Sequence, residues 1–170
     1  MAVRAYDEAT GLQRLLRRIG ASAPGSWVLR RTLHHVDGFV HRVSGHRVTA
    51  AQSLVGIPTA MLTTTGARTG RKRTVPVLAF EVTGGWGLVA SSFGQERHPG
   101  WYYNLLAHPD AVLEVDGVAT DVVARRVHGA EREAVRAAAL RIYPGYVVYE
   151  RRASHRELGY FVLTPTPPGQ

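Results

Sequence analysis

The residues best suited to chemistry in this chain stand in one short loop, GARTGRKR at residues 66–73. Gly66 and Gly70 permit a close approach of a ligand to the backbone. Between and after them the loop supplies cations and a hydroxyl donor, at Arg68, Thr69, Arg71, Lys72 and Arg73. Cations, hydroxyls and backbone N–H groups are what a phosphate or polycarboxylate requires of its site. The loop alone is equally compatible with a solvated basic hairpin, so its role depends on the rest of the chain.

The common nucleotide-binding motifs do not fit this loop. Gly70 is followed by Arg71-Lys72-Arg73, not by the Lys-Ser/Thr pair of a Walker A motif. No GxGxxG element stands at a strand-to-helix turn, so a Rossmann site is not predicted. What remains is a strand–loop–strand cluster of cations, which indicates an anion without specifying which one.

A second group of residues is aromatic. Trp101, Tyr102, Tyr103 and Asn104 come shortly after a run of small residues at 90–92. Aromatic surface with one amide suits a pocket for a planar ligand, and core packing with buried tyrosines explains the same pattern.

The third group is YPGYVVY at residues 143–149, in which Tyr143, Tyr146 and Tyr149 are three residues apart. At this spacing tyrosines project to one side of a helical turn, so several hydroxyls could face one cavity. An aromatic cluster that only caps the fold is the alternative.

Other chemistries find little support. The chain has no cysteine, which excludes disulfides, thiolate zinc sites and cysteine nucleophiles. His34, Asp37 and His41 share a face of an expected helix, but without a fourth ligand or a HExxH pattern a solvated polar face is favoured and no metal site is predicted. No Ser-His-Asp order or paired-carboxylate pocket stands out. An anion anchor, an aromatic slot and phenol donors suit a protein that holds a redox cofactor.

The net charge of +8 raises the question of nucleic acid. The basic residues are scattered along the chain, Lys72 is the single lysine, and no nucleic-acid-binding motif is present. We therefore expect no nucleic-acid partner.

The N-terminal part reads as two amphipathic helices, at residues 6–19 and 27–43, which form a helical extension over residues 1–45. Arginines line their polar faces, so the helices could lie on a membrane surface or pack on the remaining domain or a dimer partner. No run approaches the ~20 apolar residues of a spanning helix, and no secretory signal is apparent. We expect a cytoplasmic protein, with peripheral contact at the inner face of the plasma membrane as an open alternative.

The remaining residues, 46–170, alternate between strand and helix signals. Helices are expected from residues 98–99 to 107 and at 130–142, and strands at 59–65, 73–82, 86–91, 112–115, 118–127 and 158–164. Pro76 marks a bulge or an edge position within the second strand. This order predicts an α+β protein with a small, largely antiparallel barrel.

The three groups of residues, in this order and spacing, resemble the deazaflavin (F420)-dependent nitroreductases, a family of split β-barrel oxidoreductases. The resemblance covers residues 59–165 and rests on LTTTGARTGRKRTVP, VASSFGQERHPGWYYNL and YPGYVVY. It implies an FMN-binding-like split barrel at residues 46–170 that binds coenzyme F420.

The resemblance also implies roles for individual residues. The phosphate and glutamate tail of the coenzyme would be held by Arg68, Thr69, Gly70, Lys72 and Arg73, with Pro76 closing the motif. Ser91, Ser92 and the adjacent backbone would border the deazaflavin ring, and Trp101 and Asn104 would complete its pocket. Tyr143, Tyr146 and Tyr149 match the family's substrate-facing tyrosines. The implied reaction is hydride transfer from the reduced coenzyme to a quinone, enone or nitro-aromatic acceptor.

Two departures from the family pattern stand out. Ala67 replaces a basic residue, which leaves one fewer cation, and Phe93 replaces a glycine, which makes the loop bulkier and changes the expected substrate range. A non-catalytic F420 carrier and a split barrel for FMN or haem remain as alternatives, although FMN has no polyglutamate tail for so basic a loop. The expected partners are a small-molecule acceptor and, in a homodimer, a second copy of the chain; a monomer is equally compatible.

Overall fold

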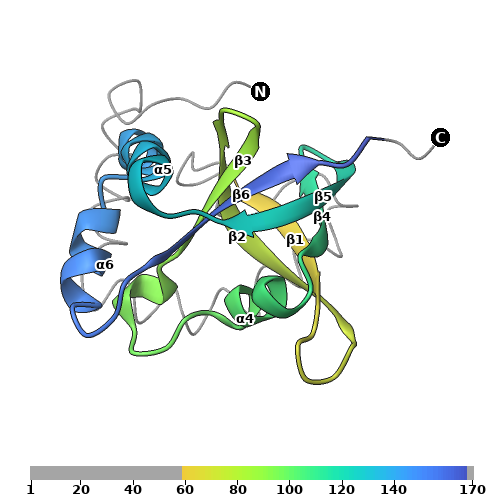
Figure 1. Ribbon diagram of the computed structural model, residues 1–170, viewed down its shortest axis with the longest axis horizontal. Coiled ribbons are helices and arrows are strands. Elements are labelled where there is room, and N and C mark those ends of the chain that lie inside the picture. Colours follow the sequence, from red (N-terminus) through yellow and green to blue (C-terminus); the bar gives the residue numbers. More distant parts are fainter. Residues whose placement is uncertain (1–58, 168–170) are drawn as a thin grey trace.

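Six antiparallel strands close into a barrel in the computed structural model, which describes residues 59–167 (Figure 1). In chain order they are β1 (Thr59–Thr65), β2 (Lys72–Val82), β3 (Gly85–Ala90), β4 (Asp110–Val115), β5 (Val118–Arg126) and β6 (Gly159–Pro165). Around the barrel the order is β1-β2-β3-β6-β5-β4, and β4 pairs with β1 to close the circle. The last strand therefore lies between β3 and β5, and it brings the C-terminal segment beside the middle of the chain.

Helical elements lie outside the strands. A short left-handed turn, η2 (Ser92–Gly94), and α4 (Gly100–Ala107) follow β3, while α5 (Gly129–Ile142) and α6 (Tyr146–Arg152) follow β5. In Figure 1, α4 lies below the barrel, between the tip of the β1–β2 hairpin and η2, and α5 and α6 lie to the left. None of the described helices has the length and apolar character needed to span a membrane.

Strand β2 changes partner along its length. Residues 72–78 pair with β1, whereas residues 79–82 pair with β3. Pro76 lies opposite Met61 of β1, in the part of β2 for which no pairing with β3 is formed. A proline lacks the N–H that a second partner would need, so of the two positions that the sequence allowed, a bulge or an edge, the structure has the edge position.

Two hydrophobic cores lie on opposite faces of β6. Alternate residues of a strand point to opposite faces, so Phe161 and Leu163 enter the barrel interior while Tyr160 and Val162 face outward. The interior core also contains Leu62, Leu88 and Leu113. The outer core is covered by α5, whose residues Val135, Ala138 and Ala139 follow the spacing of one helical face. Since both faces of β6 are buried, this strand fixes the helices relative to the barrel.

The sequence prediction and the structure agree on the order of the elements along the chain, and they differ at the tyrosines. The sequence indicated a helical turn at the tyrosines, and the structure has a seven-residue helix, α6, after Pro144. The expected strand and helix limits agree within two residues. The predicted N-terminal helices, the boundary at residue 45 and the group His34, Asp37 and His41 lie outside the described residues.

Candidate functional site

The basic loop between β1 and β2 is a defined turn. The N–H of Gly66 donates to the carbonyl of Arg71 at 2.9 Å, and the N–H of Gly70 donates to the carbonyl of Gly66 at 2.8 Å. Gly70 has a φ of +65°, a left-handed conformation that glycine adopts without cost. A Cβ at Gly66 would lie 2.7 Å from Thr69 Oγ1 and 3.1 Å from the Arg71 carbonyl, so a side chain would displace the loop. The two glycines thus shape the backbone from which the cations project.

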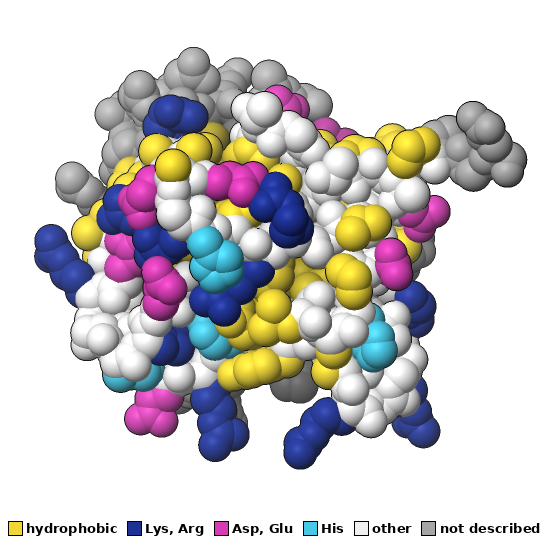
Figure 2. All heavy atoms as spheres, in the orientation of Figure 1, with side chains coloured by type: hydrophobic (Ala, Val, Ile, Leu, Met, Phe, Trp, Pro, Cys, Tyr) yellow, Lys and Arg dark blue, Asp and Glu magenta, His cyan; other side chains and the backbone are white. Residues whose placement is uncertain are grey.

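The cations of this loop are exposed. Arg68, Arg71, Lys72 and Arg73 all face solvent, and among the described residues none of the four forms an ion pair. Figure 2 shows dark-blue side chains projecting around the tip of the β1–β2 hairpin, at the lower right. A group of exposed cations on a hydrogen-bonded turn fits a multiply charged anion such as a phosphate bearing a polycarboxylate tail. The residues present therefore fit the anion-binding role that the family resemblance implies for this loop.

Asn104 of α4 connects the basic loop to the helix. Its side-chain Oδ1 accepts from the N–H of Ala67 at 3.0 Å, and its Nδ2 donates to Thr64 Oγ1 at 2.9 Å. Asn104 is 9% exposed and Thr64 is 1% exposed. Both ends of the amide are thus engaged within the protein, and Asn104 fixes the loop at the point where it leaves β1.

We expect Asn104→Leu to lower stability by about 2 kcal/mol, because it removes two hydrogen bonds and leaves the buried Thr64 hydroxyl unpaired. In a chain of this length that corresponds to roughly 4–8 °C in Tm. Asn104→Asp is the matched variant, since a carboxylate accepts from the Ala67 N–H and from a rotated Thr64 hydroxyl. If thermal denaturation showed the same decrease in Tm for both variants, the hydrogen bonds of Asn104 would not be the cause of its contribution to stability.

The residues after β3, here named the 91–98 loop, contain the most strained backbone of the site. Ser92, Phe93 and Gly94 have φ values of +47°, +56° and +79°. A residue with a Cβ in the left-handed region costs about 1–2 kcal/mol. Two such residues in succession require support from the surrounding structure, as is found at many functional sites.

Arg156, in the turn between α6 and β6, contacts the 91–98 loop at three points. Its Nη2 donates to the carbonyl of Ser91 at 2.9 Å, its Nε donates to the carbonyl of Gln95 at 2.9 Å, and its Nη1 lies 3.0 Å from His98 Nδ1. A guanidinium has no acceptor, so His98 Nδ1 accepts this hydrogen bond and is the unprotonated ring nitrogen. Sequence reasoning did not identify Arg156, and it used His98 only as a helix start.

His98 joins the loop to α4. Its ring is stacked on that of Tyr102, with centroids 3.8 Å apart and planes 8° from parallel. Burial and then the charge of Arg156 lower the pKa of His98, while a backbone hydrogen bond at Ala90 acts in the opposite direction. The neutral imidazole is therefore favoured, in agreement with its role as an acceptor for Arg156.

The three tyrosines form one buried cluster. Tyr143, Tyr146 and Tyr149 are 7%, 4% and 3% exposed, and the hydroxyls of Tyr143 and Tyr149 are 3.0 Å apart. Burial is the main cause that raises the pKa of Tyr143 and of Tyr146 well above the ordinary value of a phenol. Both phenols stay neutral at physiological pH and can donate hydrogen bonds. The ring of Phe93 lies edge-on to Tyr149, with centroids 5.7 Å apart.

The structure brings the three sequence motifs into one series of contacts. Asn104 joins the basic loop to α4, His98 joins α4 to the 91–98 loop, and Phe93 joins that loop to the tyrosines. Ser91 and Ser92 are half-buried in the loop. Trp101 is half-buried with its ring 5.9 Å from Phe161 of the barrel core, and Pro76 is half-buried in β2.

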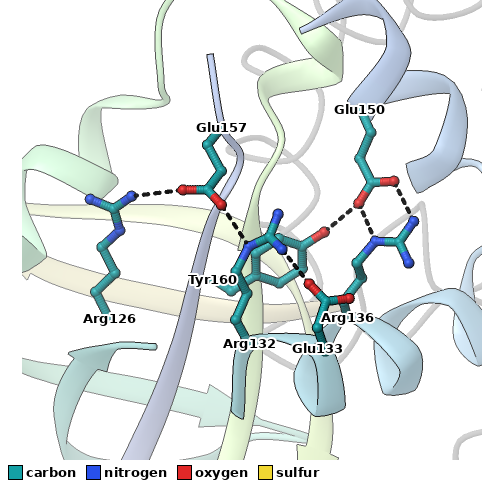
Figure 3. A network of polar contacts seen from close by, with 7 residues as sticks. All are labelled: Arg126, Arg132, Glu133, Arg136, Glu150, Glu157 and Tyr160. Atoms are coloured by element: carbon teal, nitrogen blue, oxygen red, sulfur yellow. Dashed lines mark hydrogen bonds and ion pairs between the residues drawn. The ribbon is translucent and has the colours of Figure 1, made fainter. Parts of the chain in front are cut away.

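A cleft of about 240 Å³ lies elsewhere, beside α5 and α6, and is lined by Arg132, Arg136, Glu150, Arg156, Glu157 and Leu158. Figure 3 shows that most of its charged groups pair with one another. Arg136 donates twice to Glu150, at 2.6 and 2.7 Å, and Arg132 contacts Glu133 and Glu157. Arg132 Nε lies 3.1 Å from Glu157 without the alignment of a hydrogen bond. Arg132 and Arg136 are paired with carboxylates and Arg156 is engaged by the 91–98 loop, so this cleft fits an anion less well than the exposed basic loop does.

The six-stranded antiparallel barrel with its outer helices is a split barrel of the FMN-binding-like type. Residues 35–165 match the profile of the F420H(2)-dependent quinone reductase family. That match spans more than half of the sequence, and the chain belongs to this family.

Individual relatives agree with this assignment. An F420H(2)-dependent quinone reductase of Mycobacterium tuberculosis is 37% identical over 83 residues, which are 49% of this chain and 52% of that protein. The chain thus spans about half the length of the curated relatives that it matches. A solved structure of an F420-H2 dependent reductase is 36% identical with a TM-score of 0.57, over 62% of this chain and 93% of that one. A second solved structure, described as a domain-swapped dimer, is 31% identical with a TM-score of 0.60, over 83% and 99% of the two chains.

Proposed function

We propose that this protein is an F420-dependent reductase that transfers a hydride from the reduced coenzyme to a quinone, with enones and nitro-aromatic compounds as further acceptors. The observation that carries the proposal is the exposed basic loop, which forms no ion pair with the described residues and is hydrogen-bonded to α4, in a chain of the F420H(2)-dependent quinone reductase family. The reduced coenzyme, when bound, would supply the hydride. The protein's own residues would bind the coenzyme tail, orient the deazaflavin ring and donate a hydrogen bond or a proton to the acceptor.

Binding of the coenzyme tail is proposed for the basic loop. Arg68, Lys72 and Arg73 would neutralise phosphate and carboxylate groups, and Thr69 would donate its hydroxyl. Gly70 allows the backbone to approach an anion closely, since no atom of the described residues, apart from Gly70 and its two chain neighbours, lies within 4 Å of the position of its missing Cβ. The same residues cannot all be used by FMN, which has one phosphate and no tail.

Orientation of the deazaflavin ring is proposed for Ser91, Ser92, Trp101 and the backbone around them. Asn104 is assigned to this pocket by the family resemblance, and its two hydrogen bonds support an indirect part, through the position of the basic loop. Pro76 would act in the same way, through the shape of β2.

The tyrosine cluster is proposed to face the acceptor. A neutral phenol whose pKa is raised by burial donates a hydrogen bond to an oxygen that gains negative charge, and it gives up its proton only to a stronger base. The hydroxyl of Tyr143 lies 3.0 Å from that of Tyr149, so one can orient the other. The proton that the reduced acceptor requires would come from this pair or from water.

We expect Tyr149→Phe to slow turnover by about 10- to 100-fold, which is the effect of losing about 1.5–3 kcal/mol of hydrogen bonding to a developing charge. Coenzyme affinity should remain nearly normal. Tyr143→Phe is the matched variant, because it breaks the same hydroxyl–hydroxyl contact while it keeps the Tyr149 hydroxyl. Equal single-turnover rates for wild type and Tyr149→Phe would refute the donor role.

The proposal is tested by a fluorescence titration with F420, FMN and haem, followed by an acceptor screen with the reduced deazaflavin. Preference for F420 and reduction of at least one acceptor are the expected results. Tight F420 binding without turnover of any acceptor would instead indicate a carrier protein. Preference for FMN or haem would overturn the proposal.

We further propose a cytoplasmic protein that is a monomer or a homodimer, the latter supported by the relative described as a domain-swapped dimer. Light scattering on the purified chain distinguishes the two states. The proposed peripheral membrane contact concerns the N-terminal helices, which lie outside the described residues. Liposome co-sedimentation with and without residues 1–44 tests it, and binding that is absent or unaltered by the deletion would count against it.

A further inference from the structure

We infer that Arg156 is a positioning residue of this site. It holds the 91–98 loop, so that Ser91, which is proposed to border the coenzyme ring, and Tyr149, which is proposed to donate to the acceptor, keep a fixed separation. The inference rests on the proposed function, because Ser91 and Tyr149 are given their roles there. The hold on the loop itself is a property of the protein without any ligand, and it can be measured separately.

The first argument is the way in which the guanidinium is used. The three acceptors stand at the start, the middle and the end of the loop, and they are 65, 61 and 58 residues before Arg156 in the chain. A planar guanidinium presents its N–H groups in a fixed fork, so three bonds to one loop define its position as well as its distance. The ammonium of lysine carries its three N–H donors on a single nitrogen, so it cannot bond at once to three acceptors that are this far apart.

The second argument is that the loop needs an external hold. Ser92, Phe93 and Gly94 all occupy the left-handed region, which is unfavourable for the first two. Within the loop, the Ser91 carbonyl accepts from the N–H of Gly94 at 2.9 Å, and Arg156 Nη2 bonds to the same carbonyl. The loss of Arg156 would therefore remove the support from the oxygen at which the left-handed turn closes.

The third argument is that the loop reaches the proposed donor. Phe93 packs edge-on against the ring of Tyr149. At Gly94, a Cβ would lie 2.9 Å from the carbonyl of Tyr149 and 2.5 Å from Cβ of Arg152, so η2 is in close contact with α6. A shift of the loop is thus transmitted to Tyr149 as well as to Ser91, and the separation of the two depends on Arg156.

Arg132 provides a matched control. It lines the same cleft as Arg156 and is also half-buried, but its side chain contacts Glu133, Glu157 and the face of the Tyr160 ring. Among the described residues, Arg132 forms no hydrogen bond or ion pair with the 91–98 loop. Arg132→Lys therefore perturbs the same region without changing the hold on the loop.

The first experiment compares hydrogen exchange of the full-length wild type, Arg156→Lys and Arg132→Lys without coenzyme. We expect the amides of Gly94 and Gln95, which bond within the loop, to exchange at least about tenfold faster in Arg156→Lys alone. Amides of β6 should be unchanged in all three proteins. Unchanged protection of Gly94 and Gln95 in Arg156→Lys would overturn the inference whatever the protein's activity.

The second experiment measures F420 affinity and single-turnover hydride transfer for the same proteins. We expect Arg156→Lys to bind F420 within about threefold of wild type, because the basic loop is untouched, and to transfer hydride at least about tenfold more slowly. For Arg156→Ala, low millimolar guanidinium ion should restore part of the rate. A rate equal to that of Arg132→Lys, or losses of affinity and rate in equal measure, would overturn the inference.

The two proposals fail in different ways. A wild-type protein without affinity for F420 refutes the proposed function, and the hydrogen-exchange comparison still decides whether Arg156 holds the loop. A wild-type protein that binds and reduces, with an Arg156→Lys variant that does so equally well, refutes the inference alone.

Discussion

Arg73→Ala is expected to weaken F420 binding by about 10- to 100-fold. The side chain stands at the beginning of β2, is exposed and has no ion-pair partner among the described residues, so its charge is available to a ligand. A charge-assisted hydrogen bond to a phosphate or carboxylate is worth about 1.5–3 kcal/mol, which corresponds to this change in affinity. A fluorescence titration of the deazaflavin measures it directly.

Arg71→Ala is the control for this variant. Arg71 has the same charge and exposure in the same loop, but the family resemblance does not assign it to the coenzyme tail. We expect a smaller effect that disappears as salt screens long-range attraction, whereas the effect of Arg73→Ala should persist at higher salt. Neither exposed residue should alter Tm noticeably. If both variants lost the same F420 affinity, the loop would act by its total charge alone. Unchanged F420 affinity in Arg73→Ala would show that the basic loop is not part of the binding site.

The order of the strands along the chain could be predicted because the local sequence patterns were strong. Apolar runs with turn residues between them, such as Asp116-Gly117 between β4 and β5, define a strand without reference to the rest of the chain. The pairing of β6 between β3 and β5 could not be read in this way. It is a contact between distant segments, and periodicity says nothing about which strands become neighbours.

The same distinction explains the site. The basic loop, the aromatic helix and the tyrosines were each visible as local groups of residue types. Arg156 was not, because a single arginine in a turn has no periodic or compositional signal, and its partners Gln95 and Ser91 are 61 and 65 residues away in the sequence. Asn104 was predicted to complete a ring pocket, and its observed bonds to Ala67 and Thr64 depend on the same kind of long-range contact.

The left-handed conformation of Phe93 was also beyond sequence reasoning. The sequence showed only that a phenylalanine stood where relatives have glycine, and it indicated a bulkier loop. With a φ of +56°, Phe93 occupies a conformation that glycine would adopt without strain. The gain from its ring contact with Tyr149 and from the hydrogen bonds of Arg156 offsets that cost in the folded protein.

Glu150→Ala is expected to have the largest effect on stability, about 1.5–3 kcal/mol, or roughly 3–12 °C in Tm. The carboxylate accepts two hydrogen bonds from Arg136 and one, at 2.8 Å, from the hydroxyl of Tyr160, whose residue is 1% exposed. Removing it leaves a guanidinium without its partner and a phenol with a buried, unpaired hydroxyl (Figure 3). The side chains of Arg136 and Glu150 are 32% and 22% exposed, so the loss should fall below that of a fully buried pair. Since Glu150 lies on α6 next to Tyr149, the variant should also slow any reaction that uses this tyrosine.

Glu131→Ala tests whether burial or geometry causes the effect. Arg125 and Glu131 form a pair with the same two-bond geometry, at 2.6 and 2.7 Å, but their side chains are 62% and 44% exposed, and we expect no measurable change in Tm.

Acid titration of the wild type and of Glu150→Gln provides a second test. The hydrogen bond from Arg136 is the main cause that lowers the pKa of Glu150, so its stabilising contribution is complete above the ordinary glutamate pKa of 4.5 and disappears as the pH falls through the lower folded value. Glu150→Gln should therefore flatten the acid limb of the Tm profile, because an amide does not titrate. If wild type and Glu150→Gln lost stability in parallel on acidification, the charge of Glu150 would not contribute to the acid dependence of stability.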